Sequence, residues 1–259
     1  MNRIESAFTN KKAFIGFLTA GDPNFDASFE NIMAAVKAGA DLIEIGIPFS
    51  DPIAEGVVIQ AADLRALSAG MTTDRAFELA EKVRRETDIP LVFMTYLNPV
   101  FRYGYDKFFK KCAEIGVDGL ICPDLPFEEK AEADGAAKKH GIAVISMIAP
   151  TSEERIKSIS ESAEGFLYIV SSMGVTGVRS EIKTDLHSIM ESVRKYTKTP
   201  AAIGFGVSTP EQAAQMAALA DGVIVGSAIV KLVGEYGENA APKIYDYVKA
   251  MTEKIHNLG

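Results

Sequence analysis

The chain has 259 residues, of which 47% are hydrophobic and 24% charged, and its formal net charge is −8. This composition is typical of a globular protein that buries a sizeable core. The acidic balance excludes a general basic surface for nucleic acid, and no apolar run approaches the ~20 residues that a membrane-spanning helix needs. We therefore expect neither nucleic acid nor a membrane as a partner, and a phosphorylated ligand would need a local binding device.

Short apolar runs rich in β-branched residues recur along the chain and alternate with segments of helical spacing. A short helix at 4–8 is expected ahead of the first strand. Two later helix starts are marked by a hydroxyl three residues before a glutamate, at Thr151 and at Ser208. The predicted strands span residues 13–19, 42–46, 91–95, 119–122, 143–147, 166–170, 201–204 and 222–225.

Strict alternation of strands and helices predicts a parallel sheet with right-handed crossovers. Eight units favour closure of the sheet, and a closed barrel of this kind typically needs about 250 residues. We therefore predict an α/β protein, a single (β/α)₈ TIM barrel with an extra N-terminal helix at the barrel floor. Because the sequence shows no linker or low-complexity segment, residues 1–259 are expected to form one domain.

The second predicted strand carries a carboxyl group toward the barrel interior. Leu42, Glu44 and Gly46 share one face of this strand. Ile43 and Ile45 share the other face, which suits the covering helices, so Glu44 is expected to point inward near the mouth. Burial raises the pKa of such a carboxyl, which can then act as general acid and base near neutral pH. A structural ion pair is the alternative that Glu44 alone leaves open.

Glycine-rich turns follow the seventh and eighth strands, at 204–206 and 226–228. Loops at these two positions of a barrel frequently hold phosphate through backbone N–H groups and a helix N-terminus. Ordinary turn glycines are the alternative for either loop alone. A third segment, 171–178, is small and polar with two glycines, and it predicts either a lid over a ligand or a merely flexible loop.

Several kinds of chemistry are not expected from the residues present. No lysine lies in a predicted strand, so a Schiff-base mechanism lacks an obvious nucleophile. The histidines His140, His187 and His256 are scattered, so a metal site is not expected. The two cysteines, Cys112 and Cys122, are too few for a disulfide framework, and no signal-peptide pattern is evident, so a cytoplasmic location is expected.

The run 42–52, Leu-Ile-Glu-Ile-Gly-Ile-Pro-Phe-Ser-Asp-Pro, closely resembles the signature of tryptophan synthase α chains. The stretches 17–23, 174–177, 204–206 and 226–231 also match, in family order and across most of the chain. The first motif is highly specific, whereas many phosphate-binding barrels share the glycine turns. The resemblance implies a lyase that cleaves indole-3-glycerol phosphate by a retro-aldol reaction to indole and glyceraldehyde 3-phosphate.

The resemblance also implies roles for individual residues. Glu44 matches the acid–base glutamate, and Glu55 matches the second acid, which steadies the indole N–H. Thr176 matches a lid residue that hydrogen-bonds near the second acid. The phosphate site is matched by Gly177, Gly206, Gly226 and Ser227, and the indole pocket by Phe17, Met94, Tyr96, Tyr168 and Phe205.

The family works as an α₂β₂ heterotetramer in which indole passes through a tunnel to a β subunit that depends on pyridoxal phosphate. The resemblance therefore implies a β-subunit partner and no cofactor in this chain. Its implied contact surface comprises Asp51, Pro52, Asn98 and Pro99.

Two departures from the family pattern fall in the loop after the second strand. Glu55 stands where the family usually has aspartate, and Val57 stands where it has proline. A displacement of about 1 Å can cost ~100-fold in rate, and loss of proline frees the backbone. Either the loop shifts to let the acid reach, or turnover is slow until a β subunit orders the segment.

Two other functions compete with the lyase. Another phosphate-binding barrel of the same pathway would carry different groups: indole-glycerol-phosphate synthase should show a strand-borne lysine, and phosphoribosylanthranilate isomerase a cysteine–aspartate pair at strand ends. Neither pattern is evident. A non-catalytic subunit that only activates a β partner is kept open by Glu55 and Val57.

Overall fold

A closed barrel of eight parallel strands forms the centre of the computed structural model, which describes residues 3–170, 185–204 and 206–258. Each strand pairs with the next along the chain, and β8 closes the barrel on β1. The predicted (β/α)₈ barrel is confirmed. The strands are β1 (Ala13–Thr19), β2 (Leu42–Gly46), β3 (Leu91–Met94), β4 (Gly119–Ile121), β5 (Ala143–Ile148), β6 (Leu167–Val170), β7 (Ala201–Gly204) and β8 (Gly222–Val225).

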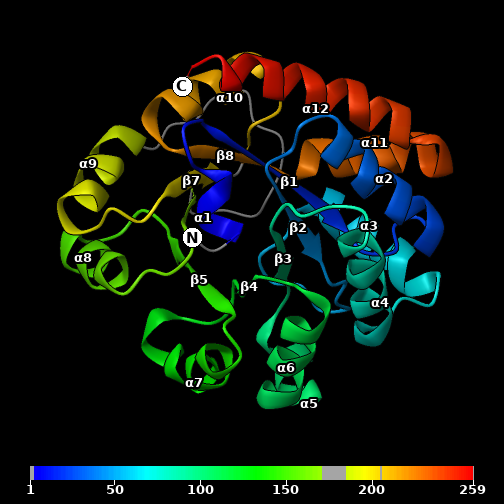
Figure 1. The fold of residues 1–259 in the computed structure, drawn as a ribbon, viewed down its shortest axis with the longest axis horizontal. Helices are drawn as coiled ribbons and strands as arrows, with labels where there is room; N and C mark the ends of the chain where they lie inside the picture. Colours follow the sequence, from blue (N-terminus) through cyan, green and yellow to red (C-terminus); the bar gives the residue numbers. More distant parts are fainter. Residues whose placement is uncertain (1–2, 171–184, 205, 259) are drawn as a thin grey trace.

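Most of the helices surround the barrel as an outer ring (Figure 1). None of the helices in the described ranges is long and apolar enough to cross a membrane. The helices are α1 (Arg3–Ala7), α2 (Phe25–Lys37), α3 (Val57–Ser68), α4 (Thr73–Arg84), α5 (Leu97–Tyr103), α6 (Tyr105–Ile115), α7 (Ala131–Lys139), α8 (Glu153–Glu161), α9 (Leu186–Tyr196), α10 (Pro210–Leu219), α11 (Ser227–Tyr236) and α12 (Ala241–His256), with short 3₁₀ turns η1 (Phe127–Glu129) and η2 (Gly237–Asn239).

The predicted strand ends are correct to within one residue. Thr95, Cys122 and Phe166 fall just outside strands, and β5 continues to Ile148.

Both predicted helix caps are wrong by one residue. Thr209 caps α10 in a capping box with Gln212, and Ser152 caps α8. For α10 the reason is Pro210, whose fixed φ suits the first helical position and leaves the cap to the residue before it.

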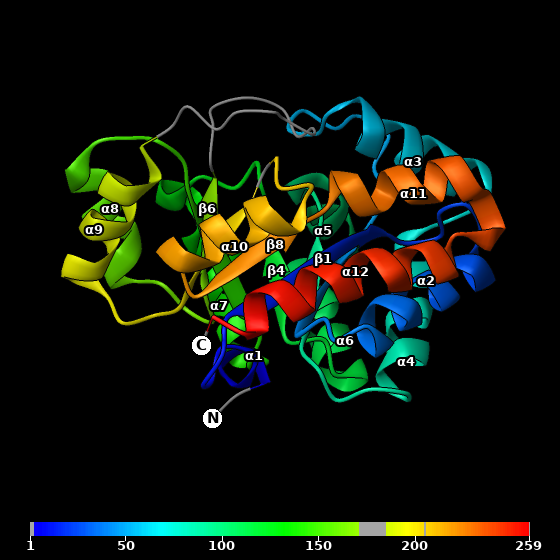
Figure 2. The ribbon, with the colours of Figure 1, turned by 90° about the horizontal axis from the view of Figure 1, so that it is seen from above.

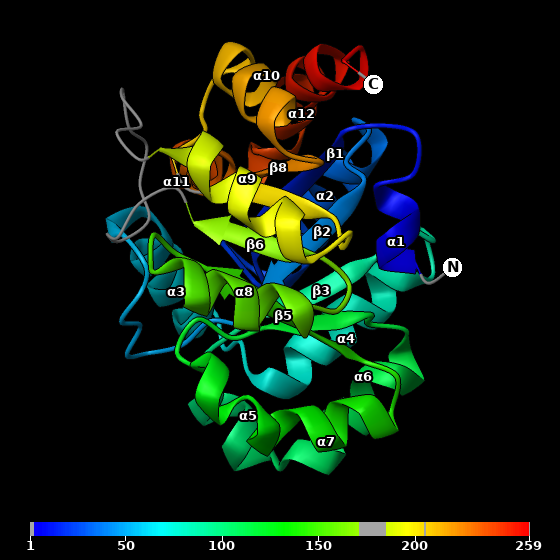
Figure 3. The same ribbon diagram turned by 90° about the vertical axis from the view of Figure 1, so that its left-hand side faces the viewer.

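The helix α1 closes the amino-terminal end of the barrel. Its Ile4 and Ala7 pack in the interior cluster with Ile15 and Leu42, and the Phe8 ring lies 5.7 Å from the Phe166 ring. Figures 2 and 3 show α1 at the opposite end of the barrel from α3 and α11. The extra N-terminal helix at the barrel floor is therefore confirmed, and the mouth of the barrel lies at the carboxyl ends of the strands.

Candidate active site

Glu44 lies on β2 in register with Phe17 of β1 and Val92 of β3. Its neighbour Ile43 packs in the outer cluster under the helices, whereas Leu42 packs in the interior cluster, so the alternation directs Glu44 into the barrel. Glu44 is fully buried, and neither carboxyl oxygen has a hydrogen-bond partner among the described residues. Desolvation raises the pKa of Glu44 to about 8, so the group is largely protonated at neutral pH.

Two aromatic rings lie at the barrel mouth where strand-end glycines leave room for them. A Cβ atom on Gly46 would lie 2.5 Å from Cζ of Phe17, and one on Gly204 would lie 2.6 Å from the hydroxyl oxygen of Tyr168. Any side chain at these glycines would displace the rings. Burial and the nearby carboxyl of Glu44 raise the pKa of Tyr168, which therefore keeps its phenolic proton.

The loop between β2 and α3 carries Glu55 and is held by Tyr96. The Tyr96 hydroxyl donates a hydrogen bond to Glu55 Oε2 and accepts one from the Ala54 N–H at 2.8 Å. The Phe49 and Tyr96 rings also contact, with centroids 5.4 Å apart. Burial raises the pKa of Glu55, and the hydrogen bond from Tyr96 opposes that rise. Tyr96, expected to line the indole pocket, thus holds Glu55, the residue expected to be the second acid.

Asp63 on α3 is a buried carboxyl that the sequence patterns did not single out. It is 6% exposed, and burial together with the charge of Glu55 raises its pKa to about 8. The signal was present, because Ile59, Ala62 and Ala66 define a buried helix face on which Asp63 also lies.

An ion pair fastens α3 over the barrel mouth. Arg65 on α3 binds Asp22, in the loop after β1, through two hydrogen bonds of 2.7 and 2.8 Å. Such bidentate pairs fix geometry as well as contributing energy. Asp22 is 2% exposed, so this contact sets the position of α3 and of the loop before it, which contains Glu55.

The predicted phosphate turns lie at the ends of β7 and β8. Gly206 has a φ of +87°, a conformation that favours glycine. Gly226 immediately precedes α11, which begins at Ser227, and the first N–H groups of a helix are free to bind an anion. A Cβ on Gly226 would lie 3.3 Å from Cβ of Phe17, so this turn borders the aromatic wall that the rings of Phe17 and Tyr168 form at the barrel mouth. The other predicted lid, phosphate and indole residues, Thr176, Gly177 and Phe205, lie outside the described residues.

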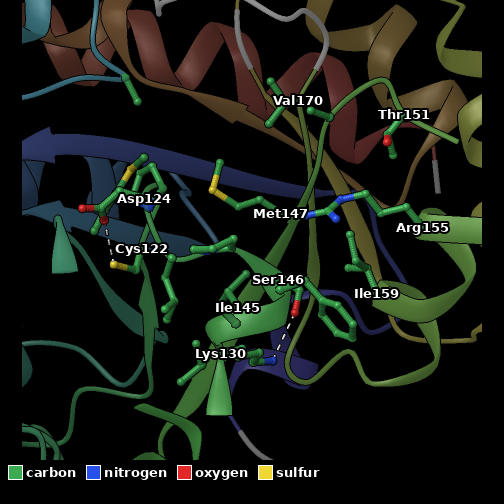
Figure 4. A pocket seen from close by; sticks show the side chains of 18 of the residues that line it. Cys122, Asp124, Lys130, Ile145, Ser146, Met147, Thr151, Arg155, Ile159 and Val170 are labelled. Carbon is green, nitrogen blue, oxygen red and sulfur yellow. Dashed lines mark hydrogen bonds between the residues drawn. The ribbon is translucent and has the colours of Figure 1, made fainter. Parts of the chain in front are cut away.

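A cavity of about 890 Å³ opens at the carboxyl ends of β3 to β6 (Figure 4). Glu55 and Met94 are among the residues that line it. Met94 also packs against the cluster that contains Phe17 and the cluster that contains Tyr168. The cavity therefore adjoins the aromatic wall of the barrel mouth, and Met94 joins the two.

The four residues expected at the partner surface lie in two neighbouring segments. Asp51 and Pro52 belong to the β2–α3 loop, and Asn98 and Pro99 to α5; the four side chains range from half-buried to exposed. The ring contact of Phe49 with Tyr96 joins these segments. Two exposed apolar side chains accompany them, Ile53 and Phe101, at 75% and 66% exposure.

Over the described ranges, no group of three or more His, Cys, Asp or Glu side chains is placed to hold a metal ion. Cys112 and Cys122 are both buried free thiols.

A closed barrel that holds a protonated carboxyl beside a cavity at its carboxyl end is the architecture of a barrel enzyme that uses acid–base chemistry. Comparison with known proteins makes the class specific. The family model for the tryptophan synthase alpha chain matches residues 5–257. The chain belongs to this family. It is a lyase of tryptophan biosynthesis that cleaves indole-3-glycerol phosphate to indole and glyceraldehyde 3-phosphate.

Individual relatives cover nearly the whole chain. The tryptophan synthase alpha chain of Lacticaseibacillus casei is 51% identical over 96% of this chain and 94% of its own length. The crystal structure of the alpha chain from Legionella pneumophila has a TM-score of 0.90 at 37% identity, covering 100% of this chain and 99% of that one. A chain from the Pyrococcus furiosus tryptophan synthase α₂β₂ complex has a TM-score of 0.85 at 35% identity, covering 94% and 98%.

Proposed function

We propose that Glu44 is the general acid and base of the cleavage. The observation that carries this proposal is its complete burial inside the barrel without a hydrogen-bond partner among the described residues, which leaves it protonated at neutral pH. A carboxyl group whose pKa lies near the working pH can give its proton to a reacting carbon and take a proton back. The buried position also keeps water from competing for that proton.

The reaction then proceeds in balanced steps. Glu44 gives its proton to C3 of the indole ring, and the resulting carboxylate takes the proton of the adjacent glycerol hydroxyl. The bond between C3 and the glycerol carbon breaks, its electron pair returns to the indole ring, and the hydroxyl oxygen becomes the aldehyde oxygen. Glu44 ends protonated again.

Glu55 is proposed to steady the indole N–H while positive charge develops on the ring. Its hydrogen bond from Tyr96 favours the ionised carboxylate that this role needs. The same contact accommodates the extra methylene of Glu55, since the longer side chain reaches a tyrosine that fixes its end. Charge stabilisation by a pre-positioned group is usually a large part of catalysis.

The remaining substrate contacts are proposed from position. The rings of Phe17 and Tyr168 and the thioether of Met94, at the barrel mouth, suit a flat heterocycle. The turn at Gly206 and the start of α11 suit the glycerol phosphate. The proposed indole contacts are Phe17, Met94, Tyr168 and Phe205, with Thr176 on the lid, and the proposed phosphate contacts are Gly177, Gly206, Gly226 and Ser227.

A β subunit is the proposed partner, in an α₂β₂ heterotetramer like that of the Pyrococcus furiosus relative. The exposed side chains of Ile53 and Phe101, beside Asp51 and Asn98, offer an apolar surface for it. Glu55 lies in the same loop as Asp51, so docking there can order the second acid. We propose that pyridoxal phosphate belongs to that partner and that this chain, acting as one domain, uses no cofactor. The two buried, unpaired cysteines suit a reducing cytoplasm.

The test is release of glyceraldehyde 3-phosphate from indole-3-glycerol phosphate by the wild type and by Glu44→Gln, with and without a β subunit. Acid–base groups typically contribute about 10²–10⁴-fold, so the variant should lose activity by that factor. Binding of a glycerol phosphate analogue should change little, because the turns at β7 and β8 are untouched. Added β subunit should accelerate the wild type, and Phe101→Ser should weaken that response.

A matched control for the surface is Leu258→Ser, which removes an exposed leucine near the C-terminus and should leave the response intact. Full activity of Glu44→Gln would show that Glu44 takes no part in the proton transfer. No cleavage by the wild type under either condition would favour the non-catalytic, activating subunit.

A further inference from the structure

The cavity beside the active site continues outward between α7 and α8. On β5, Val144 and Ile148 pack in the outer cluster and Ile145 in the interior cluster, so Ser146 faces outward toward the helices. We call the part of the cavity lined by Phe127, Lys130, Ser146, Arg155 and Ile159 the outer arm. Figure 4 shows Lys130 joined to Ser146 below Met147, with Arg155 and Ile159 reaching in from α8.

Lys130 places a buried cation in this arm. The residue is 9% exposed, and among the described residues its Nζ donates one hydrogen bond, to Ser146 Oγ at 3.1 Å. An ammonium group has three hydrogens to donate. Burial lowers the pKa of Lys130, and the charges of Asp134 and Glu164 only partly oppose that shift.

The neighbouring carboxylates do not complete the coordination of Lys130. Asp134 Oδ1 lies 4.0 Å from Lys130 Nζ, beyond hydrogen-bond distance, and the other oxygen of Asp134 pairs with Lys138 at 2.7 Å. Arg155, the second cation of the arm, is already paired with Glu128 through both of its terminal nitrogens. Over the described ranges, the ammonium group of Lys130 therefore has N–H bonds that no acceptor in the arm occupies.

The chemistry of the arm selects a ligand. Ser146 accepts the hydrogen bond from Lys130, so its own hydroxyl hydrogen remains available to an anion at the same place. The walls around this polar pair are apolar: Val144 and Ile159 are buried, and Phe127 is half-buried. An anionic group with an apolar body would pair the buried charge and bury its own hydrocarbon surface.

We propose that the outer arm binds a small organic carboxylate with an apolar or aromatic body, its carboxylate on Lys130 Nζ and Ser146 Oγ. The apolar body extends along the cavity toward Met147. Because the same cavity contains Glu55 and Met94, such a ligand restricts access to the indole side of the active site.

The phosphate of the substrate does not account for this site. The proposed phosphate turns follow β7 and β8, whereas Lys130 and Ser146 lie at β4 and β5, on the far side of the closed barrel. The substrate cannot place its phosphate at the β8 turn and at the outer arm together.

The test uses calorimetric titration of the whole protein with 3-phenylpropionate, its neutral amide and inorganic phosphate. The carboxylate should bind and the amide should bind at least tenfold more weakly, since a hydrogen bond to a charged group is worth about that factor. Lys130→Met should weaken carboxylate binding at least tenfold, and Ser146→Ala by about fivefold. Lys139→Met is the matched control: it removes an exposed lysine of the neighbouring helix α7, paired with Asp106, and should leave binding unchanged.

Thermal melting checks that each variant is folded, and Ser146→Ala keeps the proposal testable if Lys130→Met is not. Failure of the wild type to bind 3-phenylpropionate, or unchanged affinity in folded Lys130→Met, would overturn the proposal. Binding of phosphate alone in a Lys130-dependent manner would overturn the assigned ligand class. These measurements need no turnover, so they stand apart from the role proposed for Glu44. With binding established, the ligand should raise KM for indole-3-glycerol phosphate without lowering kcat.

Discussion

Carboxyl groups at the amino end of the barrel are paired with cations, whereas Glu44 and Asp63, at the carboxyl end, have no cation partner among the described residues. At the amino end, Asp41, Asp118 and Asp221 each lie just before a strand and each accept a backbone N–H from the neighbouring strand, at 2.8 to 2.9 Å. Each is also paired with a cation. The cations are Lys11 for Asp41, Arg3 and Arg84 for Asp118, and Arg194 for Asp221; a ring nitrogen of His256 also lies 2.8 Å from Asp41 Oδ2.

At the carboxyl end, Glu44 has no hydrogen-bond partner among the described residues, and Asp63 lies near the like charge of Glu55. The same residue types therefore do different work. Paired carboxylates at the amino end join strands and helices, whereas burial raises the pKa of Glu44 and Asp63 at the carboxyl end. Barrels commonly separate stability and chemistry between their two ends in this way.

The largest expected effect concerns Glu44 and the pH dependence of stability. Its pKa is about 8 in the folded state against an ordinary value of 4.5, so between these pH values the unfolded state loses a proton that the folded state keeps. The free energy of unfolding of the wild type therefore falls by up to about 1.4 kcal/mol per pH unit in that window. Because a glutamine amide cannot titrate, Glu44→Gln should gain up to about 4 kcal/mol relative to the wild type between pH 5 and pH 8.

Urea unfolding of both proteins across this range measures the difference, and the gain should level off above pH 8. A constant difference in the free energy of unfolding between pH 5 and pH 8 would mean that Glu44 titrates normally. The contrast between the two ends of the barrel would then not hold for Glu44.

At the opposite end, Asp118→Ala should destabilise the protein by about 3 kcal/mol, since removing one partner leaves a charge poorly compensated. The variant loses contacts of 2.6 Å to Arg3, 3.0 Å to Arg84 and 2.9 Å to the Leu91 N–H. Its kcat should not change under conditions in which it is folded. Asp26→Ala, which removes an 88% exposed partner of Lys82, should cost under about 1 kcal/mol. A loss of kcat in folded Asp118→Ala would show that the two ends are coupled.

The orientation of Glu44 could be predicted because β2 has a clear period of two. Leu42 points into the barrel and Ile43 points outward. Because side chains alternate along a strand, Glu44 must point inward like Leu42. The barrel itself followed from eight such runs with helices between them. These features depend on residues near one another in the sequence, where periodicity carries the information.

Features that depend on distant loops could not be predicted in the same way. Glu55 and Tyr96 meet because the loops after β2 and β3 are neighbours, and no local pattern signals a contact across 41 residues. Lys130 lies in the charged run Phe-Glu-Glu-Lys-Ala-Glu, typical of an exposed helix start, yet it is buried against Ser146 of β5. The aspartates at the amino end did leave a local signal, since each lies just before a predicted strand.

The smallest expected effect tests the second acid. Glu55→Asp withdraws the carboxylate from the Tyr96 hydroxyl by one methylene, and loss of a hydrogen bond to a charged group should lower kcat/KM about tenfold. Tyr96→Phe should have a similar effect, and the double variant should be no worse than either, because both changes remove one contact. Tyr105→Phe, which removes a 3.3 Å contact to Glu132 on the outer surface, is the matched control and should have wild-type activity. Higher activity in Glu55→Asp would instead show that aspartate suits this loop better, and that the contact with Tyr96 holds the glutamate away from the indole nitrogen.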